Sequence, residues 1–220
     1  MAEQSSPPVA PQRRGRGRRP AAEVRAGVLR AATELLLSEG IKAVTFDRVA
    51  TAAGSSKMTL YKWWPSAGAL AAEAYFTHSE PILEFPDTGD IRADITAQLC
   101  TFVRLLNTDG TGAILAGLIG VAQTDPELSA AFSLHYSATR RALAMAAFER
   151  ARERGQLRDD LDLGILVDQL WGACYHRLLI PDAPLTEEFA IALVDNALDG
   201  AGNRAAGTRR SVSGRMGRTP

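Results

Sequence analysis

Apolar residues recur at helical spacing along most of the chain. Between residues 21 and 39 they lie on one face of a helix, at Val28, Leu29, Ala32, Leu35 and Leu36. Gly40 follows, at a position where a helix end with positive φ favours glycine. The pattern therefore predicts a first helix that begins at residue 21 and ends before Gly40.

Start and stop signals then follow one another closely. Thr45 and Ser56 can each cap a helix, because a hydroxyl accepts a backbone N–H of the first turn. Gly54 separates the two segments, and Pro65 ends the second of them. Ser66 can cap a further helix. These signals predict two short helices, at about 46–53 and 57–64, and a fourth helix that runs past residue 70.

The rest of the chain has the same helical period. Apolar stripes cover 95–106, 113–122, 163–178 and 186–198, and Pro126 begins a segment that continues in one or two pieces to residue 154. Runs of alternating polar and apolar residues, which are typical of strands, are absent from the sequence. The predicted fold class is all-α: an N-terminal three-helix helix-turn-helix domain and a C-terminal helical domain for ligand binding and dimerisation.

Charge is distributed unevenly, although Lys and Arg balance Asp and Glu over the whole chain. Residues 1–70 contain eleven basic and five acidic side chains, residues 71–199 nine and twenty, and residues 200–220 five and none. We predict a disordered Arg-rich arm (1–20), a helix-turn-helix domain (21–66), a regulatory and dimerisation domain (67–199) and a disordered basic tail (200–220). A basic first third suits a polyanion such as DNA, although short segments also vary in charge by chance.

Two short helices joined by a tight glycine turn are the helix-turn-helix pattern. The second helix of such a pair enters the DNA major groove, and the first braces the backbone. Hydrogen-bond donors on the second helix are Ser56, Lys57, Thr59 and Lys62. Met58 and Thr59 offer apolar contact with a thymine methyl group, and the Tyr61 hydroxyl can donate to a phosphate.

The arm carries five arginines close before the first helix, including Arg18 and Arg19. Such a cluster can enter a minor groove, as homeodomain arms do. The alternative, a solvated leader, stays open. For the basic tail after residue 200 we prefer a plain disordered segment.

Other classes of site find little support. Cys100 and Cys174 lie far apart within apolar patterns, which indicates reduced core thiols of a cytoplasmic protein. His78, His135 and His176 do not form a metal-ligand spacing. The apolar runs are too short for a membrane helix, and catalytic or phosphate-cradling motifs are missing. We predict no enzyme activity, no cofactor, no metal and no membrane partner.

The segment GIKAVTFDRVA (40–50), followed by AGSSKMTLYKWWPS (53–66) and Leu70, resembles the N-terminal domain of the TetR (tetracycline-repressor) family. The resemblance covers residues 21–75. The segments 90–106, DPEL (125–128) and YHRLLI (175–180) with Pro184-Leu185 resemble one of the family's C-terminal domain types. Two positions depart from the family: Ser55 is usually apolar, and a phosphate-binding Lys is usual at Ala67, followed by a polar residue at Gly68.

The resemblance implies an all-helical homodimer that binds double-stranded DNA, dimerises through its last two long helices and holds a small molecule in the C-terminal domain. By position, Thr45, Tyr61 and Lys62 would contact phosphates, whereas Lys57 and Met58 would read bases. Helical bundles place small-molecule sites between helices. Most apolar residues there are core, but the candidate cavity residues are Phe102, Leu106, Leu118, Gln123, Phe132, His135, Tyr136, Trp171 and Tyr175.

The predicted function is a sequence-specific transcriptional regulator, a repressor that a small-molecule ligand releases from a near-palindromic operator. A second hypothesis is a ligand-independent DNA-binding protein whose acidic domain only dimerises or docks a partner protein. A cavity of several hundred Å³ in the C-terminal domain would speak against the second hypothesis, whereas a dry core would favour it.

Overall fold

The computed structural model describes residues 19–200, and within that range every regular element is helical. The elements are α1 (Ala21–Glu39), η1 (Ile41–Ala43), α2 (Phe46–Ala53), α3 (Lys57–Trp63), α4 (Ala67–Ser79), η2 (Glu80–Leu83), α5 (Ile91–Asn107), α6 (Thr111–Ala122), α7 (Pro126–Phe132), η3 (Ser133–Ser137), α8 (Ala138–Glu153), α9 (Leu163–Leu179) and α10 (Glu187–Asp199). The predicted all-α class is confirmed. The arm and tail expected at the two ends fall almost entirely outside the described residues.

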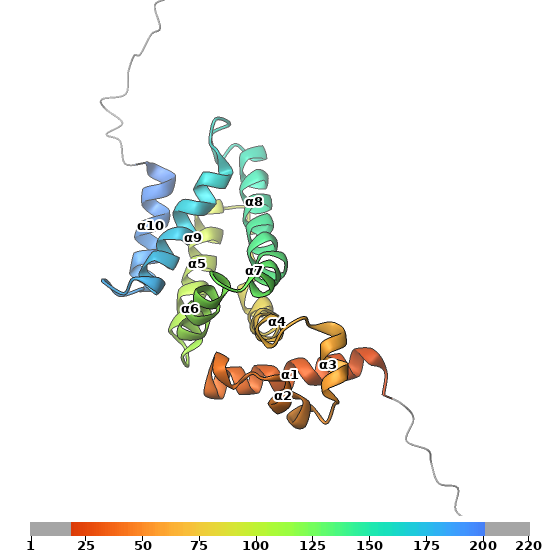
Figure 1. Cartoon of the computed structure of the whole chain (residues 1–220). Helices are drawn as coiled ribbons and strands as arrows, with labels where there is room; N and C mark the ends of the chain where they lie inside the picture. The colour runs from red at the N-terminus through yellow and green to blue at the C-terminus, as the bar shows by residue number, and fades with distance from the viewer. Residues whose placement is uncertain (1–18, 201–220) are drawn as a thin grey trace, which may run out of the picture.

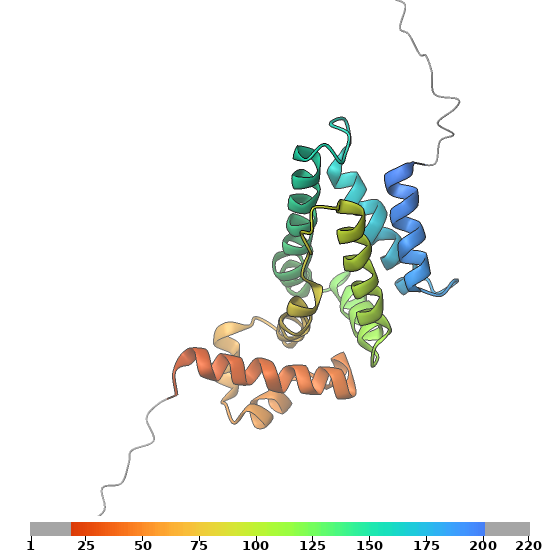
Figure 2. The same ribbon diagram turned by 180° about the vertical axis from the view of Figure 1, so that it is seen from behind.

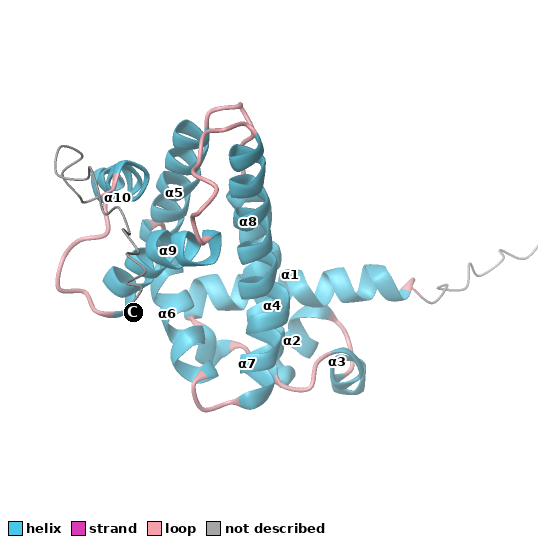
Figure 3. Ribbon diagram, turned by 90° about the horizontal axis from the view of Figure 1, so that it is seen from above, coloured by secondary structure: helices cyan, strands magenta, loops and turns pink. Residues whose placement is uncertain are grey.

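Helices α1, α2 and α3 form one group, and helices α5 to α10 stand above them (Figure 1). Helix α4 connects the groups, because it packs against α1 on one side and against α7 on the other. From behind, α4 lies at the lower end of α8 (Figure 2). Seen from above, α5, α8, α9 and α10 form the larger bundle, and α3 lies at the far edge of the molecule (Figure 3). Movement of the bundle base can therefore reach the N-terminal group through α4, and also through the contacts of α6 with α1 and η1.

The short helices begin and end where the sequence predicts. The hydroxyls of Thr45, Ser56 and Ser66 each accept the backbone N–H three residues further on, at 3.3, 3.2 and 3.1 Å. Gly54 adopts the left-handed conformation, with φ 60° and ψ 38°. Because that conformation costs a residue with a Cβ about 1 kcal/mol or more, glycine fixes the sharp turn between α2 and α3.

One continuous apolar core runs from α1 to α10. Val28, Ala32 and Leu36 on α1 have no exposed surface, as the predicted stripe requires, whereas Leu35 is only partly buried. The largest fully buried side chains of the core include Tyr75 and Phe102. The N-terminal group is thus not an isolated unit, since its core is continuous with that of the bundle.

The segment that begins at Pro126 is helical to Glu153, but not uniformly so. Between α7 and α8, residues 133–137 form a turn of π-helix. A π-turn widens the helix by one residue and often marks a functional position. Here it carries Tyr136, which is buried beneath α4.

Within residues 19–200, no single helix is both long and apolar enough to cross a membrane. Helices α5 and α6 reach the required length and composition only when taken together, and they bend by 89° at the break between them.

Candidate nucleic-acid interface and regulatory cavity

Helix α3 presents an unusually exposed face. Leu60 points into the core and has no exposed surface, whereas Met58 is 77% exposed and Tyr61 57% exposed. Lys57 and Lys62 are exposed beside them. These four positions, one and four residues apart, share one side of the helix. A face with two cations, an unsupported methionine and an aromatic ring is suited to contact another molecule.

The Tyr61 ring is supported by a residue of the core. It packs edge-to-face on Phe46 of α2, with ring centroids 4.6 Å apart. Phe46 is itself buried in the core. The tyrosine therefore projects from a fixed base, which lowers the entropy lost when its exposed part binds a partner.

Three of the predicted DNA-facing residues already have partners within the chain. Lys57 forms an ion pair with Asp47 of α2, and both side chains are about half exposed or more. The hydroxyls of Ser56 and Thr59 lie 2.9 Å apart and hydrogen-bond to each other. An exposed ion pair contributes only about 0–1 kcal/mol, so Lys57 can exchange Asp47 for another anion at little cost.

The remaining predicted contacts lie at the edges of this face. Thr45 is exposed at the start of α2, and Arg19 is exposed just before α1. Arg18 lies outside the described residues. Ser55, where an apolar residue is usual in the resembled pattern, is half buried in the turn.

The surroundings of Gly68 explain why a glycine stands where the resembled family usually has a polar residue. A Cβ at Gly68 would lie 3.7 Å from the carboxylate of Asp125, the residue that caps α7, and 3.6 Å from Leu128 of α7. An acidic side chain at residue 68 would therefore face a second carboxylate. Glycine avoids this repulsion, whereas a Cβ alone would make only ordinary van der Waals contacts here.

Glu73 of α4 ties α3 to α1. One carboxylate oxygen accepts from Arg25 of α1 at 2.5 Å, and the other accepts from the indole N–H of Trp64 at 2.7 Å. Trp64, the residue after α3, is 2% exposed, and Arg25 also lies over its ring at 5.2 Å. We call these three residues the Glu73 clamp. Sequence reasoning missed it, because its partners are 9 and 48 residues away.

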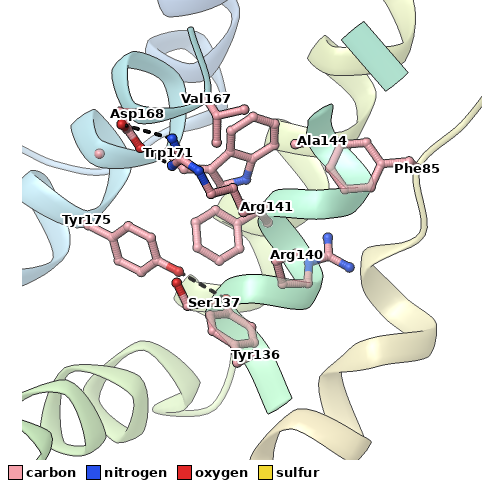
Figure 4. Close-up of a pocket in the computed structure, with 12 residues that line it drawn as sticks. Phe85, Tyr136, Ser137, Arg140, Arg141, Ala144, Val167, Asp168, Trp171 and Tyr175 are labelled. Atoms are coloured by element: carbon pink, nitrogen blue, oxygen red, sulfur yellow. Dashed lines mark hydrogen bonds and ion pairs between the residues drawn. The ribbon is translucent and has the colours of Figure 1, made fainter. Parts of the chain in front are cut away.

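A cavity of about 200 Å³ lies between α5, α8 and α9 (Figure 4). Its walls are largely aromatic, and charged groups stand at two places. The lining residues are Phe85, Phe102, Tyr136, Ser137, Arg140, Arg141, Ala144, Val167, Asp168, Trp171, Gly172 and Tyr175. The arrangement is that of a small-molecule site: concave, mostly apolar and with few polar groups.

The predicted cavity residues divide into two groups. Phe102, Tyr136, Trp171 and Tyr175 line this cavity together. The others lie elsewhere: Leu106 and Leu118 are in the packed core, Phe132 packs against Tyr136 from outside the cavity, and Gln123 and His135 are exposed. Sequence reasoning missed Phe85, Arg140, Arg141 and Asp168 as lining residues.

Phe85 belongs to the segment that joins η2 to α5. This segment is fixed to the end of α8, because the Asp87 carboxylate pairs with Arg150 at 3.0 Å and with Arg154 at 2.7 Å. The Arg154 hydrogen bond is the main reason why the pKa of Asp87 is lowered. Two ion pairs thus hold the wall that carries Phe85.

Most polar groups of the cavity have a hydrogen-bond or ion-pair partner within the described part of the chain. The Tyr175 hydroxyl donates to the Tyr136 hydroxyl at 3.2 Å, and Arg141 pairs with Asp168 at the rim. Burial raises the pKa of both tyrosines, so they are neutral donors at physiological pH. Arg140 differs: its buried Nη2 has no hydrogen-bond partner within the described part of the chain.

The cavity is linked to α4 by stacked aromatic rings. Tyr136 stacks on Phe76 of α4, with centroids 4.4 Å apart and planes inclined by 14°. Phe132 packs against both rings. Phe76 lies one turn beyond Glu73, so a shift of Tyr136 would bear on the helix that carries the Glu73 clamp.

Among residues 19–200, no group of three His, Cys, Asp or Glu side chains is placed to hold a metal ion. Cys100 and Cys174 are both buried free thiols.

Comparison with known proteins agrees with this division of the chain. Residues 28–74 match the family described as bacterial regulatory proteins, tetR family, and residues 85–197 match the tetracyclin repressor-like C-terminal domain. The HTH-type transcriptional regulator YdeS of Bacillus subtilis is 34% identical over 173 residues, which are 79% of this chain and 87% of YdeS.

Two further relatives support the same grouping. The DNA-binding transcriptional repressor TetR of Mycobacteroides abscessus is 29% identical over 174 residues, which cover 79% of this chain and 90% of that protein. The crystal structure of the TetR family transcription regulator SCO0332 superposes with a TM-score of 0.78 at 57% identity. That match covers 82% of this chain and 100% of the other.

Proposed function

The chain belongs to the TetR family and is a DNA-binding transcriptional regulator with a helix-turn-helix, and we propose that it is a repressor which a small molecule releases from its operator. The observation that carries the DNA-binding half is the exposed face of α3, with Lys57, Met58, Tyr61 and Lys62 on one side. The observation that carries the ligand half is the aromatic cavity between α5, α8 and α9.

On DNA, α3 enters the major groove. Lys57 and Met58 face base edges, and Tyr61, Lys62 and Thr45 contact phosphates on either side. Ser56 and Thr59 lie at the start of the same helix and add hydroxyl donors. Arg18 and Arg19 continue the basic surface toward a neighbouring minor groove.

The regulator acts as a homodimer in the cytoplasm, with α9 and α10 at the interface. Both helices leave apolar side chains on the surface: Ile165 is 55% exposed, Leu179 43% and Ile191 44%. Gly172, at the middle of α9, is exposed and would allow close approach of a second helix. Two such protomers would hold their α3 helices roughly 34–36 Å apart, in successive major grooves of a near-palindromic site.

Ligand binding acts through α4. A molecule that displaces Tyr136 shifts Phe76, and α4 then carries the N-terminal groups away from the spacing that DNA requires. Allosteric coupling of about 1–3 kcal/mol, or roughly 5- to 150-fold in affinity, is typical. The alternative, a ligand-independent regulator with a domain that only dimerises or docks a partner, is less favoured because the bundle contains a cavity lined by aromatic rings, although its volume of about 200 Å³ is below the several hundred Å³ that would speak most strongly against it.

The placement of α3 is tested with three alanine variants. The Lys62→Ala variant should weaken binding to all DNA sequences and reduce the slope of log affinity against log salt by about one unit. The Lys57→Ala variant should instead relax sequence preference at particular bases. Lys42→Ala, which removes an exposed lysine of η1 outside α3, is the matched control.

The readout is fluorescence anisotropy with operator and random DNA over a range of salt concentrations. If Lys62→Ala and Lys57→Ala both bind like Lys42→Ala, α3 does not enter the groove in this way.

A further inference from the structure

The cavity presents its lining residues in two regular series. From the η3–α8 stretch, Tyr136, Arg140 and Ala144 point inward, four residues apart. From α9, Trp171 and Tyr175 do the same. Side chains four apart share one helix face, so the two faces are complementary walls rather than a chance opening.

The charges of the lining do not cancel. Arg141 is paired with Asp168 at the rim (Figure 4). Arg140 is a second cation, and no carboxylate of the described chain forms a salt bridge with it. Glu80 acts on it only from a distance. The cavity therefore carries one positive charge without a partner.

The surroundings of Arg140 destabilise its charged form. Burial lowers the pKa of its guanidinium, and Nη2 lacks a hydrogen-bond acceptor. The Phe85 ring lies 5.2 Å from the guanidinium carbon and offers only a cation–π contact. A buried donor without an acceptor costs about 1–3 kcal/mol, and an anion that reaches the guanidinium would relieve this cost. Because Nη2 itself is enclosed, the Arg140 side chain has to turn toward the cavity to meet that anion.

A second donor lies one turn away. The Tyr136 hydroxyl accepts from Tyr175, which leaves its own hydrogen free to donate. Tyr136 and Arg140 lie at positions i and i+4 and influence each other electrostatically. A planar carboxylate can accept from a guanidinium and a phenol together, and the forked guanidinium suits its two oxygens.

The size and the walls limit the rest of the ligand. An apolar cavity of about 150 Å³ holds one benzene ring in another protein. The volume of about 200 Å³ here leaves room for one ring and a small acidic substituent. Phe85, Phe102 and Trp171 supply ring faces and edges against which an aromatic ring packs.

We infer that the cavity binds a single-ring aromatic carboxylate, whose carboxylate is held by Arg140 and Tyr136 and whose ring lies among Phe85, Phe102 and Trp171. This inference rests on the proposed ligand response and gives the chemical class of its effector.

The test is isothermal titration calorimetry of the full-length protein with benzoate, phenylacetate and cinnamate. Benzamide provides the ring without the charge, and acetate provides the charge without the ring. At least one aromatic acid should bind, its amide roughly 10- to 100-fold more weakly, and acetate not measurably. Failure of all three acids to bind, or equal binding of acid and amide, would overturn the inference.

Variants assign the binding to Arg140. Arg140→Met should reduce acid binding to the level of the amide, and Arg140→Lys, which keeps the charge but loses the fork, should give an intermediate loss. Tyr136→Phe should weaken the acid more than the amide. Arg158→Met, which removes an arginine that is 73% exposed, is the control. Circular dichroism shows whether each variant is folded. If Arg140→Met is unfolded, acid binding by the Arg140→Lys and Tyr136→Phe variants decides whether Arg140 and Tyr136 hold the carboxylate. Unchanged acid binding in the folded variants contradicts the assignment.

Release of operator DNA is measured separately, so the two proposals fail in different ways. If an aromatic acid binds through Arg140 but leaves DNA affinity unchanged, the inference about the ligand class is supported and the proposal of ligand-controlled repression is refuted. If another class of compound releases DNA and the aromatic acids do not bind, the repressor proposal is supported and the inference about the ligand class is refuted.

Discussion

Replacement of Glu73 by leucine should loosen the attachment of α3 to the rest of the protein. The variant leaves the Trp64 N–H, in a residue only 2% exposed, without its acceptor. An unpaired buried donor costs about 1–3 kcal/mol. The Arg25 side chain is 40% exposed and regains water, so loss of its ion pair adds no more than about 1 kcal/mol. The expected loss is therefore about 1–4 kcal/mol.

Urea denaturation, followed by far-ultraviolet circular dichroism, measures this loss. Glu73→Gln keeps an acceptor for Trp64 and should cost about 1 kcal/mol. Trp64→Phe removes the donor, so in the double variant with Glu73→Leu the two losses should fall short of additivity by about 0.5–3 kcal/mol. Glu34→Leu, at an exposed position of α1, is the control and should stay within about 0.5 kcal/mol of the parent.

Operator binding should weaken in parallel, because the Glu73 clamp sets the angle of α3 to α1. A Glu73→Leu variant as stable as the parent, or strictly additive losses in the double variant, would refute this view of the clamp.

The other predictions concern thiols, acid and glycines. Burial raises the pKa of Cys174 to about 12 and also raises that of Cys100, so iodoacetamide at mildly alkaline pH should label neither until urea unfolds the protein. The pKa of Asp87 is lowered in the folded state, so its contribution is present above the unfolded value and lost as pH falls through the folded one. The difference in melting temperature between the parent and Asp87→Asn should therefore exist at neutral pH and shrink as the pH falls below the ordinary pKa of an aspartate. Gly54→Ala should destabilise by about 1–2 kcal/mol because of its positive φ, whereas Gly120→Ala, on an open face of α6, should stabilise by up to about 1 kcal/mol; equal effects in urea titrations would contradict this.

Local signals made the N-terminal helices predictable. A capping hydroxyl or a glycine with positive φ acts within three or four residues, so Thr45, Gly54 and Ser56 could be interpreted without knowledge of the fold. Met58 and Tyr61 are exposed, as their predicted contact with DNA requires, and Leu60 between them faces the core.

The cavity was only partly predictable, for a related reason. Large aromatic residues on apolar stripes, such as Phe102 and Trp171, point inward, and some of them border the empty space. Polar neighbours in the sequence do not share that direction. His135 is adjacent to Tyr136 but lies on the outer side of the helix and is exposed.

What remained hidden depends on contacts across the fold. Arg140 resembles any surface arginine of an amphipathic helix until Phe85, from a distant segment, covers it. The π-turn that carries Tyr136 was not expected from the sequence, and neither was the stacking of Tyr136 on Phe76 of α4. Glu73 likewise gains its role only when α1 and α3 meet α4.

Dimeric, sequence-specific binding is tested by selection of tight-binding fragments from random DNA, with the full-length protein at near-physiological salt. We expect enrichment of an inverted repeat whose half-sites lie about one helical turn apart, as two α3 helices in successive major grooves require. We also expect loss of that enrichment when Lys57 and Met58 are replaced by alanine. Fragments without a repeat, bound weakly and only at low salt, would contradict a dimeric, sequence-specific regulator that reads DNA through α3.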